Sequence, residues 1–96
     1  MPETDEYEKK PLKVKNLKLI DYSNRTYAIF GLDMSTVYRI DNVGAGVLIM
    51  CDGKKTIGQI SDEIARRTKL ELEAVRPIVK NILDEMEKLG FVQFIQ

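Results

Sequence analysis

The sequence predicts a small α+β domain of the winged helix-turn-helix type, in which a three-stranded antiparallel sheet is followed by three helices. Two observations lead to this fold class. Up to residue 40, apolar and polar residues alternate in short runs separated by turn residues, as in a half-buried antiparallel sheet. From residue 42 onward, apolar residues recur at helical spacing in three consecutive segments. The length of 96 residues suits one such domain.

Residues 1–11 are predicted to be a flexible tail, outside a single domain formed by residues 12–96. The tail carries four acidic residues followed by Lys9 and Lys10, and Pro11 marks the edge of the fold. It lacks the apolar stretch of a signal peptide, and the longest apolar run, near residues 46–51, is far shorter than a membrane span. We therefore expect a cytoplasmic protein without a membrane partner.

Three strands are expected, at residues 12–19, 26–32 and 36–40. In the first, Leu12 and Val14 alternate with lysines, and Leu17 and Leu19 continue after a one-residue slip that predicts a bulge or a break. Turn-forming residues occupy positions 21–25, and Gly31 with residues 33–35 supplies a second turn. This spacing predicts an antiparallel meander, whose edge strands must be either covered or used.

The first two helices are expected to begin at capping residues. Asn42 is predicted to cap the first helix, which ends at a turn where Gly53 supplies a positive φ. Thr56, followed three residues later by Gln59, is the signature of a capping box at the start of the second helix. The buried face of the second helix is then formed by Ile57, Ile60, Ile64 and Ala65.

The third helix is the longest periodic segment, residues 72–89. Its apolar residues form one wide stripe, consisting of Val75, Ile78, Val79, Ile82, Leu83, Met86 and Leu89. Pro77 suggests that the helix begins later than Leu72, because proline is tolerated mainly in a first turn. Gly90 suits the position after the helix, and residues 91–95 predict a closing strand or a tail packed on the sheet.

The composition argues against an enzyme. Histidine is absent, which removes the usual general base and the commonest metal ligand. Cys51 is the only cysteine and follows an apolar run, so we interpret it as a small buried hydrophobe. The carboxylates of the third helix have no catalytic partner in the pattern and are best explained as a solvated face. We expect no catalytic residue and no metal site.

Nucleic-acid binding is the first alternative function, because winged-helix domains often place a basic helix in the DNA groove. The chain has 15 basic and 15 acidic residues, and residues 71–90 carry five acids against three bases. We therefore expect no nucleic-acid partner. If the alternative is correct, affinity for DNA falls steeply with salt. A structural or dimerisation module that uses the same open sheet edge is a second alternative.

The sequence pattern favours peptide binding over nucleic-acid binding. An edge strand presents unpaired N–H and C=O groups that an extended peptide can use. The wide apolar stripe of the third helix is able to receive the side chains of that peptide. The same residues, among them Val75, Val79, Ile82 and Met86, are equally compatible with a place in the core.

An ordered set of motifs resembles the PqqD-like peptide chaperones, also called precursor-peptide recognition elements. The set comprises Tyr38-Arg39-Ile40-Asp41-Asn42 with Gly44, the run from Leu48 to Asp52-Gly53, Thr56-Ile57 with Ile60, and the stretch from Met86 to Val92. The resemblance extends over residues 27–92, most of the chain.

The resemblance implies a non-catalytic adaptor that binds the leader of a ribosomally made precursor peptide. It would present the leader to a modifying enzyme such as a radical S-adenosylmethionine (radical SAM) maturase, which carries the cofactors, so none is expected here. The leader would add to the third strand and pack on the third helix. The implied site residues are Thr36, Val37, Tyr38 and Arg39 for strand pairing, Val75, Val79, Ile82, Leu83 and Met86 for the groove, and Arg76 and Lys80 for acidic leader residues.

Overall fold

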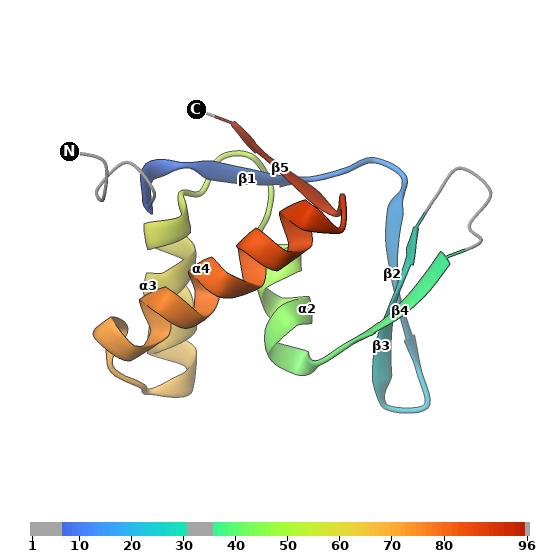
Figure 1. Ribbon diagram of the computed structural model, residues 1–96. Helices are drawn as coiled ribbons and strands as arrows, with labels where there is room; N and C mark the ends of the chain where they lie inside the picture. The colour runs from blue at the N-terminus through green and yellow to red at the C-terminus, as the bar shows by residue number, and fades with distance from the viewer. Residues whose placement is uncertain (1–6, 31–35, 96) are drawn as a thin grey trace.

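The computed structural model describes residues 7–30 and 36–95 and shows an α+β fold (Figure 1). An antiparallel sheet is formed by β2 (Leu17–Tyr22), β3 (Arg25–Phe30) and β4 (Thr36–Ile40), in the order β2-β3-β4. Three helices follow, α2 (Asn42–Ile49), α3 (Ile57–Thr68) and α4 (Leu72–Lys88). The sheet stands at one end of the molecule, α3 lies at the other, and α2 lies between them (Figure 1). The predicted fold class is confirmed, and the arrangement is compatible with the winged helix-turn-helix type.

A second, two-stranded sheet joins the two ends of the chain. Strand β1 (Lys10–Lys13) pairs antiparallel with β5 (Val92–Ile95). Pro11 is fully buried, and its carbonyl accepts a hydrogen bond from the Gly53 amide at 2.9 Å. Lys10 and Pro11, which the sequence analysis placed in the tail, are thus strand residues, while residues 1–6 of the predicted tail lie outside the described part of the chain. The predicted closing strand is present as β5.

The slip in the first predicted strand is a break between two strands of different sheets. Lys15 and Asn16 form a turn that separates β1 from β2. Val14 packs against the core that contains Leu17. These two residues are three positions apart, so in one continuous strand their side chains would lie on opposite faces. The turn resolves this conflict.

The hairpin from β2 to β3 turns at Ser23 and Asn24, which have φ values of 56° and 63°. Two successive positive φ values are typical of the two-residue hairpin turn whose twist matches that of the strands, and asparagine tolerates this conformation well. Strand β4 has the predicted bounds and pairs with β3 from Thr26↔Ile40 to Phe30↔Thr36. The predicted turn at 31–35 and the predicted end of the second strand at residue 32 lie outside the described residues.

The first two helices begin with side-chain caps. Asp41, rather than the predicted Asn42, caps α2, and its Oδ1 accepts a hydrogen bond from the Gly44 amide at 2.7 Å. The two residues compete for one position, and a carboxylate facing the helix N-terminus has the better electrostatics. The capping box of α3 is confirmed, since Thr56 Oγ1 accepts from the Gln59 amide and Gln59 Oε1 accepts from the Thr56 amide. Gly53 has the predicted positive φ of 77°.

Helix α4 begins at Leu72, so the prediction of a later start was wrong. Pro77 lies inside the helix on its exposed side. Proline lacks an N–H, and the helical carbonyl four residues earlier belongs to Glu73, which is also exposed and open to water. The helix ends at Lys88, one residue before the predicted end, with Leu89 as its C-cap. Gly90 follows with the positive φ of 83° that suits the position after a helix, and the Phe91 amide donates to the Met86 carbonyl at 2.9 Å.

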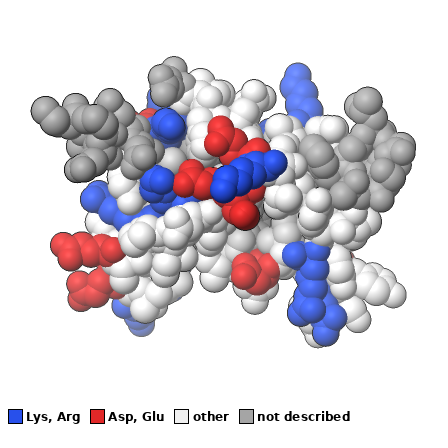
Figure 2. Space-filling model, viewed as in Figure 1, with Lys and Arg blue, Asp and Glu red and all other residues white. Residues whose placement is uncertain are grey.

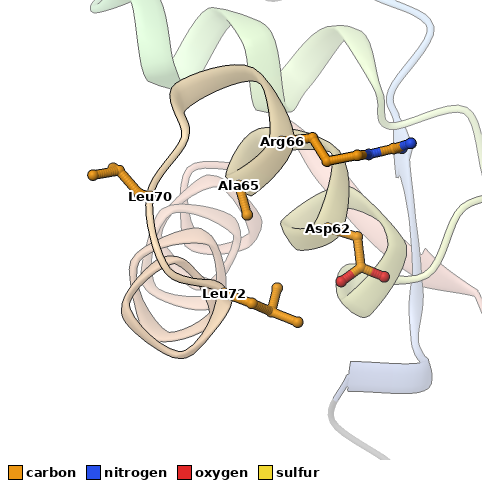
Figure 3. A pocket seen from close by; sticks show the side chains of 5 residues that line it. All are labelled: Asp62, Ala65, Arg66, Leu70 and Leu72. Atoms are coloured by element: carbon orange, nitrogen blue, oxygen red, sulfur yellow. The ribbon is translucent and has the colours of Figure 1, made fainter.

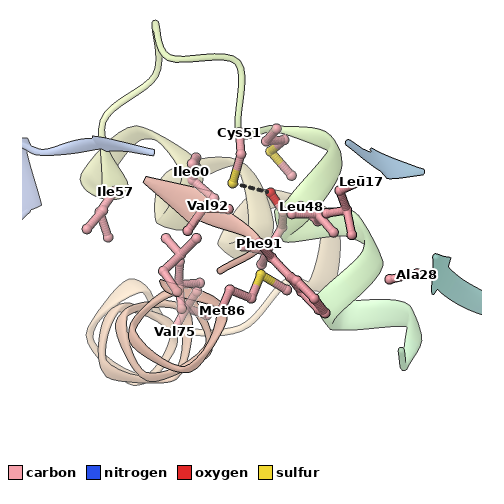
Figure 4. Close-up of a cluster of buried hydrophobic side chains, with 14 residues drawn as sticks. Leu17, Ala28, Leu48, Cys51, Ile57, Ile60, Val75, Met86, Phe91 and Val92 are labelled. Carbon is pink, nitrogen blue, oxygen red and sulfur yellow. Dashed lines mark hydrogen bonds between the residues drawn. The ribbon is translucent and has the colours of Figure 1, made fainter. Parts of the chain in front are cut away.

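One hydrophobic core lies where the helices meet the sheet and β5 (Figure 4). Helix α4 contributes a single buried face, and Phe91 and Val92 close the core from the C-terminal side. The least exposed members of the cluster are Leu17, Ala28, Val47, Leu48, Ile57, Ile60, Val75, Val79, Leu83 and Phe91.

Candidate peptide-binding site at the β4 edge

Strand β4 is an edge strand of the sheet. It pairs with β3 on one side, and within residues 7–30 and 36–95 no strand pairs with its other side. Its free edge therefore presents backbone N–H and C=O groups without a sheet partner in this part of the chain. Val37, Tyr38 and Arg39 are exposed along it. Such an edge is the structural requirement for adding a peptide strand.

An apolar groove of about 280 Å³ lies directly beside this edge. It is bounded on one side by the end of β4 and on the other by the C-terminal half of α4, and Phe91 lies between them. The groove is lined chiefly by Tyr38, Ile40, Ile82, Met86, Leu89 and Phe91. A peptide paired with β4 would therefore direct the side chains of one face into an apolar space.

Aromatic packing fixes the floor of the groove. The rings of Tyr38 and Phe91 meet edge to face, with centroids 5.2 Å apart and an interplanar angle of 74°. This geometry places the positive edge of one ring against the negative face of the other. Because Phe91 is itself buried in the core, Tyr38 is held in place although it is partly exposed. The groove is thus preformed on the strand side.

Gly44 allows α2 to approach the groove closely. A Cβ atom at this position would lie 3.0 Å from Ile40 Cγ2 and 3.8 Å from Met86 Cε. Both neighbours line the groove, so a larger residue at position 44 would push on its wall. The sequence signal for this constraint was the glycine two residues after Asn42, which the sequence analysis used as a family motif but did not assign to the site.

The structure separates the predicted site residues on α4 into two groups. Ile82 and Met86 line the groove, and Met86 is at the same time a buried member of the core cluster. Val75, Val79 and Leu83 are at most 1% exposed and lie in the core cluster. These three side chains therefore belong to the core, the alternative that the sequence left open. On β4, Tyr38 and Arg39 line the groove and Thr36 and Val37 belong to the edge strand.

The two predicted cations of α4 do not line the groove. The Arg76 guanidinium lies over the Tyr7 ring, 5.4 Å from its centroid. Lys80 Nζ forms an ion pair with Asp84 Oδ2 at 2.9 Å. The charged residues at the groove are instead Arg39, which was predicted for strand pairing, and Asp41 and Glu85, which were not predicted as site residues. No local pattern indicated Glu85, because its proximity to the strand edge depends on how α4 packs against β4.

Cys51 has the environment of a structural cysteine. Its Sγ donates a hydrogen bond to the Val47 carbonyl at 3.3 Å (Figure 4). Burial, with a smaller contribution from the nearby Asp52 carboxylate, raises the pKa of the thiol to about 12. A thiol with this pKa stays protonated near neutral pH and is not a nucleophile. Among the described residues, no group of three His, Cys, Asp or Glu side chains is placed to hold a metal ion.

A larger hollow of about 580 Å³ lies elsewhere, where the end of α3 turns into α4. Its labelled residues, Asp62, Ala65, Arg66, Leu70 and Leu72, spread apart instead of converging on a common point (Figure 3). No strand edge is among its lining residues. Despite its size, it offers neither the backbone pairing nor the predominantly apolar lining of the β4 groove.

Fold and site together define a small α+β domain that combines an open strand edge with an adjacent apolar groove, the arrangement of a peptide-recognition module. The family model of PqqD, coenzyme PQQ synthesis protein D, matches residues 26–92. The chain belongs to the PqqD family, and this membership implies a role as a peptide-binding partner in coenzyme PQQ biosynthesis. Comparisons with curated proteins and with solved structures gave no significant match. In the described part of the chain, no helix has the length and apolar character needed to cross a membrane.

Proposed function

We propose that this protein is a non-catalytic adaptor of the cytoplasm that binds the leader of a ribosomally synthesised precursor peptide. It presents the leader to a modifying enzyme such as a radical SAM maturase. The observation that carries the proposal is the open edge of β4 directly beside the apolar groove. Family membership supports the peptide as the ligand class. We assign leader binding to a single domain, residues 12–96. The β1 residues Lys10 and Pro11 precede this range and complete its first strand.

The leader would join the sheet as a fourth strand, about 4.8 Å from β4. Backbone hydrogen bonds to β4 supply affinity that depends little on sequence, and the groove supplies selectivity through alternate side chains. Strand β4 has five residues, which limits the paired segment to a similar length. Side chains on the helix side of the new strand would contact Ile82, Met86 and Leu89, so every second leader residue should be apolar.

The charges at the groove suggest how the ends of the paired segment are fixed. Arg39 and Glu85 both line the groove and have opposite signs. The Asp41 carboxylate already accepts the Gly44 amide, which leaves Glu85 as the acid more open to a ligand. Because these residues are exposed, their contribution is to orientation more than to affinity.

Amide NMR titration of isotope-labelled protein with the synthetic leader of its precursor peptide tests the proposal. We expect shifts along β4 and at Ile82 and Met86, saturating at micromolar leader. A scrambled leader of identical composition is the control and should cause no saturating shifts. Absence of leader binding, or shifts confined to the hollow around Leu70 and Leu72, would overturn the proposal.

A further inference from the structure

The sheet β2-β3-β4 has a second face, directed away from the core. Directly opposed residues of an antiparallel sheet share a face. The register therefore places Lys18 and Val37 on it, together with the rung Ile20↔Tyr27↔Arg39 and the pair Tyr22↔Arg25. We call this set the outer sheet face. The opposite face carries Leu17 and Ala28, which are buried in the core.

The outer sheet face is apolar yet exposed. Ile20, Tyr22 and Val37 are 42%, 72% and 57% exposed. None of them, nor Tyr27, belongs to the core cluster or packs against it. The helices lie on the other side of the sheet (Figure 1), and no described helix or strand covers this face. Exposed apolar residues that are contiguous rather than scattered mark interaction surfaces.

The charged residues of the outer sheet face all have the same sign. They are Lys18, Arg25 and Arg39, of which Arg39 also lines the groove at the sheet edge, and the register puts no acidic residue among them. Asp21, the one acid of β2, lies on the opposite face and accepts a hydrogen bond from Thr26 Oγ1 at 3.0 Å. The chain as a whole is neutral, so this sign is local. In the view of Figure 2 the sheet end shows Lys and Arg, whereas the visible Asp and Glu lie over the helices.

We propose that the outer sheet face is the docking surface for an acidic patch on a protein partner, namely the enzyme that modifies the bound peptide. The identity of this partner rests on the function proposed above. Charge complementarity selects an acidic surface. The apolar centre of the face is formed by Ile20, Tyr22, Tyr27 and Val37, and only a protein surface can bury these side chains. Three cations would release few counterions from a nucleic acid and would give weak binding to its backbone.

The same face would be extended by a bound leader. A strand added to β4 directs one set of side chains into the groove and the other set outward, beside Val37 and Arg39. The partner would then contact the adaptor and the outward side chains of the leader together. In this arrangement the groove would hold one face of the leader, while the other face would stay accessible to the enzyme.

The test uses a charge-reversal variant, Lys18→Glu with Arg25→Glu, whose positions lie on β2 and β3 and do not line the groove. The matched control is Lys54→Glu with Lys69→Glu, two exposed lysines outside the sheet that undergo the same change of charge. Association with the purified radical SAM maturase of the same pathway is measured by biolayer interferometry, without leader, at low and high salt. We expect about tenfold slower association or more for the sheet variant at low salt and little change for the control.

A second variant, Tyr22→Ser with Ile20→Ser, removes apolar area without changing charge and should speed dissociation at both salt concentrations. Leader affinity, measured in parallel, should stay within about twofold for both sheet variants, which also shows that they fold. Normal maturase binding by both variants, or no maturase binding by the wild type, overturns the docking surface. Loss of leader binding by the wild type would instead refute the proposed function. The wild type could instead bind single-stranded DNA tightly, with an affinity that falls steeply with salt and is lost in the charge-reversal variant. That result would assign the face to nucleic acid and overturn the proposal.

Discussion

Replacing Gly44 by alanine should destabilise the protein, whereas the same change two residues later, at Gly46, should stabilise it. Both glycines lie in α2, and neither has a positive φ, so alanine is compatible with the backbone at each. The surroundings differ. A Cβ at position 44 would lie 3.0 Å from Ile40 Cγ2 and 3.1 Å from Asp41 Oδ1, whereas a Cβ at position 46 has no atom within 4 Å.

The magnitudes follow from three opposing effects. Alanine gains up to about 1 kcal/mol over glycine in helix propensity at either position. At position 44, overpacking costs about 1–3 kcal/mol. Displacement of the Asp41 carboxylate weakens the cap by about 1 kcal/mol more. We therefore expect Gly44→Ala to lose about 1–3 kcal/mol of unfolding free energy and Gly46→Ala to gain up to about 1 kcal/mol.

Urea unfolding followed by circular dichroism measures the unfolding free energy of both variants. The slope of this free energy against urea concentration should be the same for the two. In a domain of this size, 1 kcal/mol corresponds to a shift of about 4–8 °C in Tm, so the two variants should be separated by several degrees. Equal stability of Gly44→Ala and Gly46→Ala would refute the close approach of α2 to the groove wall. A Gly44→Ala protein that is less stable but has an altered slope would instead indicate a changed denatured state.

The remaining predictions concern the groove, the helix cap and the buried thiol. Ile82→Ser should lower leader affinity about tenfold, as measured by calorimetry, whereas Ile78→Ser on the exposed side of α4 should leave it unchanged; equal effects would remove the groove from the site. Asp41→Ala should cost about 1 kcal/mol in urea unfolding and Asn42→Ala much less, and the reverse order would restore Asn42 as the cap. Because the pKa of Cys51 is raised to about 12 in the folded state, its contribution to stability is present below the ordinary thiol pKa and declines as pH rises from about 9 toward 12. Thermal unfolding should therefore show a smaller loss above pH 9 for Cys51→Ala, and an identical pH profile would contradict burial of the thiol.

Features set by neighbouring residues were predictable from the sequence. The capping box at Thr56 and Gln59 and the positive φ values of Gly53 and of Gly90, just after α4, all depend on contacts within a few residues. The bounds of β4 also follow from local patterning between turn residues. The choice between Asp41 and Asn42 was less certain, because both are good capping residues and only the backbone geometry distinguishes them.

Features that depend on distant parts of the chain were not predictable. The pairing of β1 with β5 joins opposite ends of the sequence, and neither short segment carries a signal for its partner. The wide stripe of α4 gave no means of separating Leu83, which is core, from Ile82, which lines the groove, since they are adjacent and both apolar. The family resemblance made Arg76 available for acidic leader residues, whereas in the structure its guanidinium lies over the Tyr7 ring.

The central claim, that a peptide binds as an added strand on β4, is tested most directly by single N-methylation along the synthetic leader. Each methyl group removes one backbone donor of the peptide and leaves the protein unchanged. In strand pairing, successive N–H groups point to opposite sides, so only every second position should matter. We expect about tenfold weaker binding or more at alternate positions of a segment of about five residues, with little effect between them. Sensitivity that recurs every three to four residues would indicate a helix bound in the groove, and uniform insensitivity would exclude backbone pairing; either result would contradict strand addition.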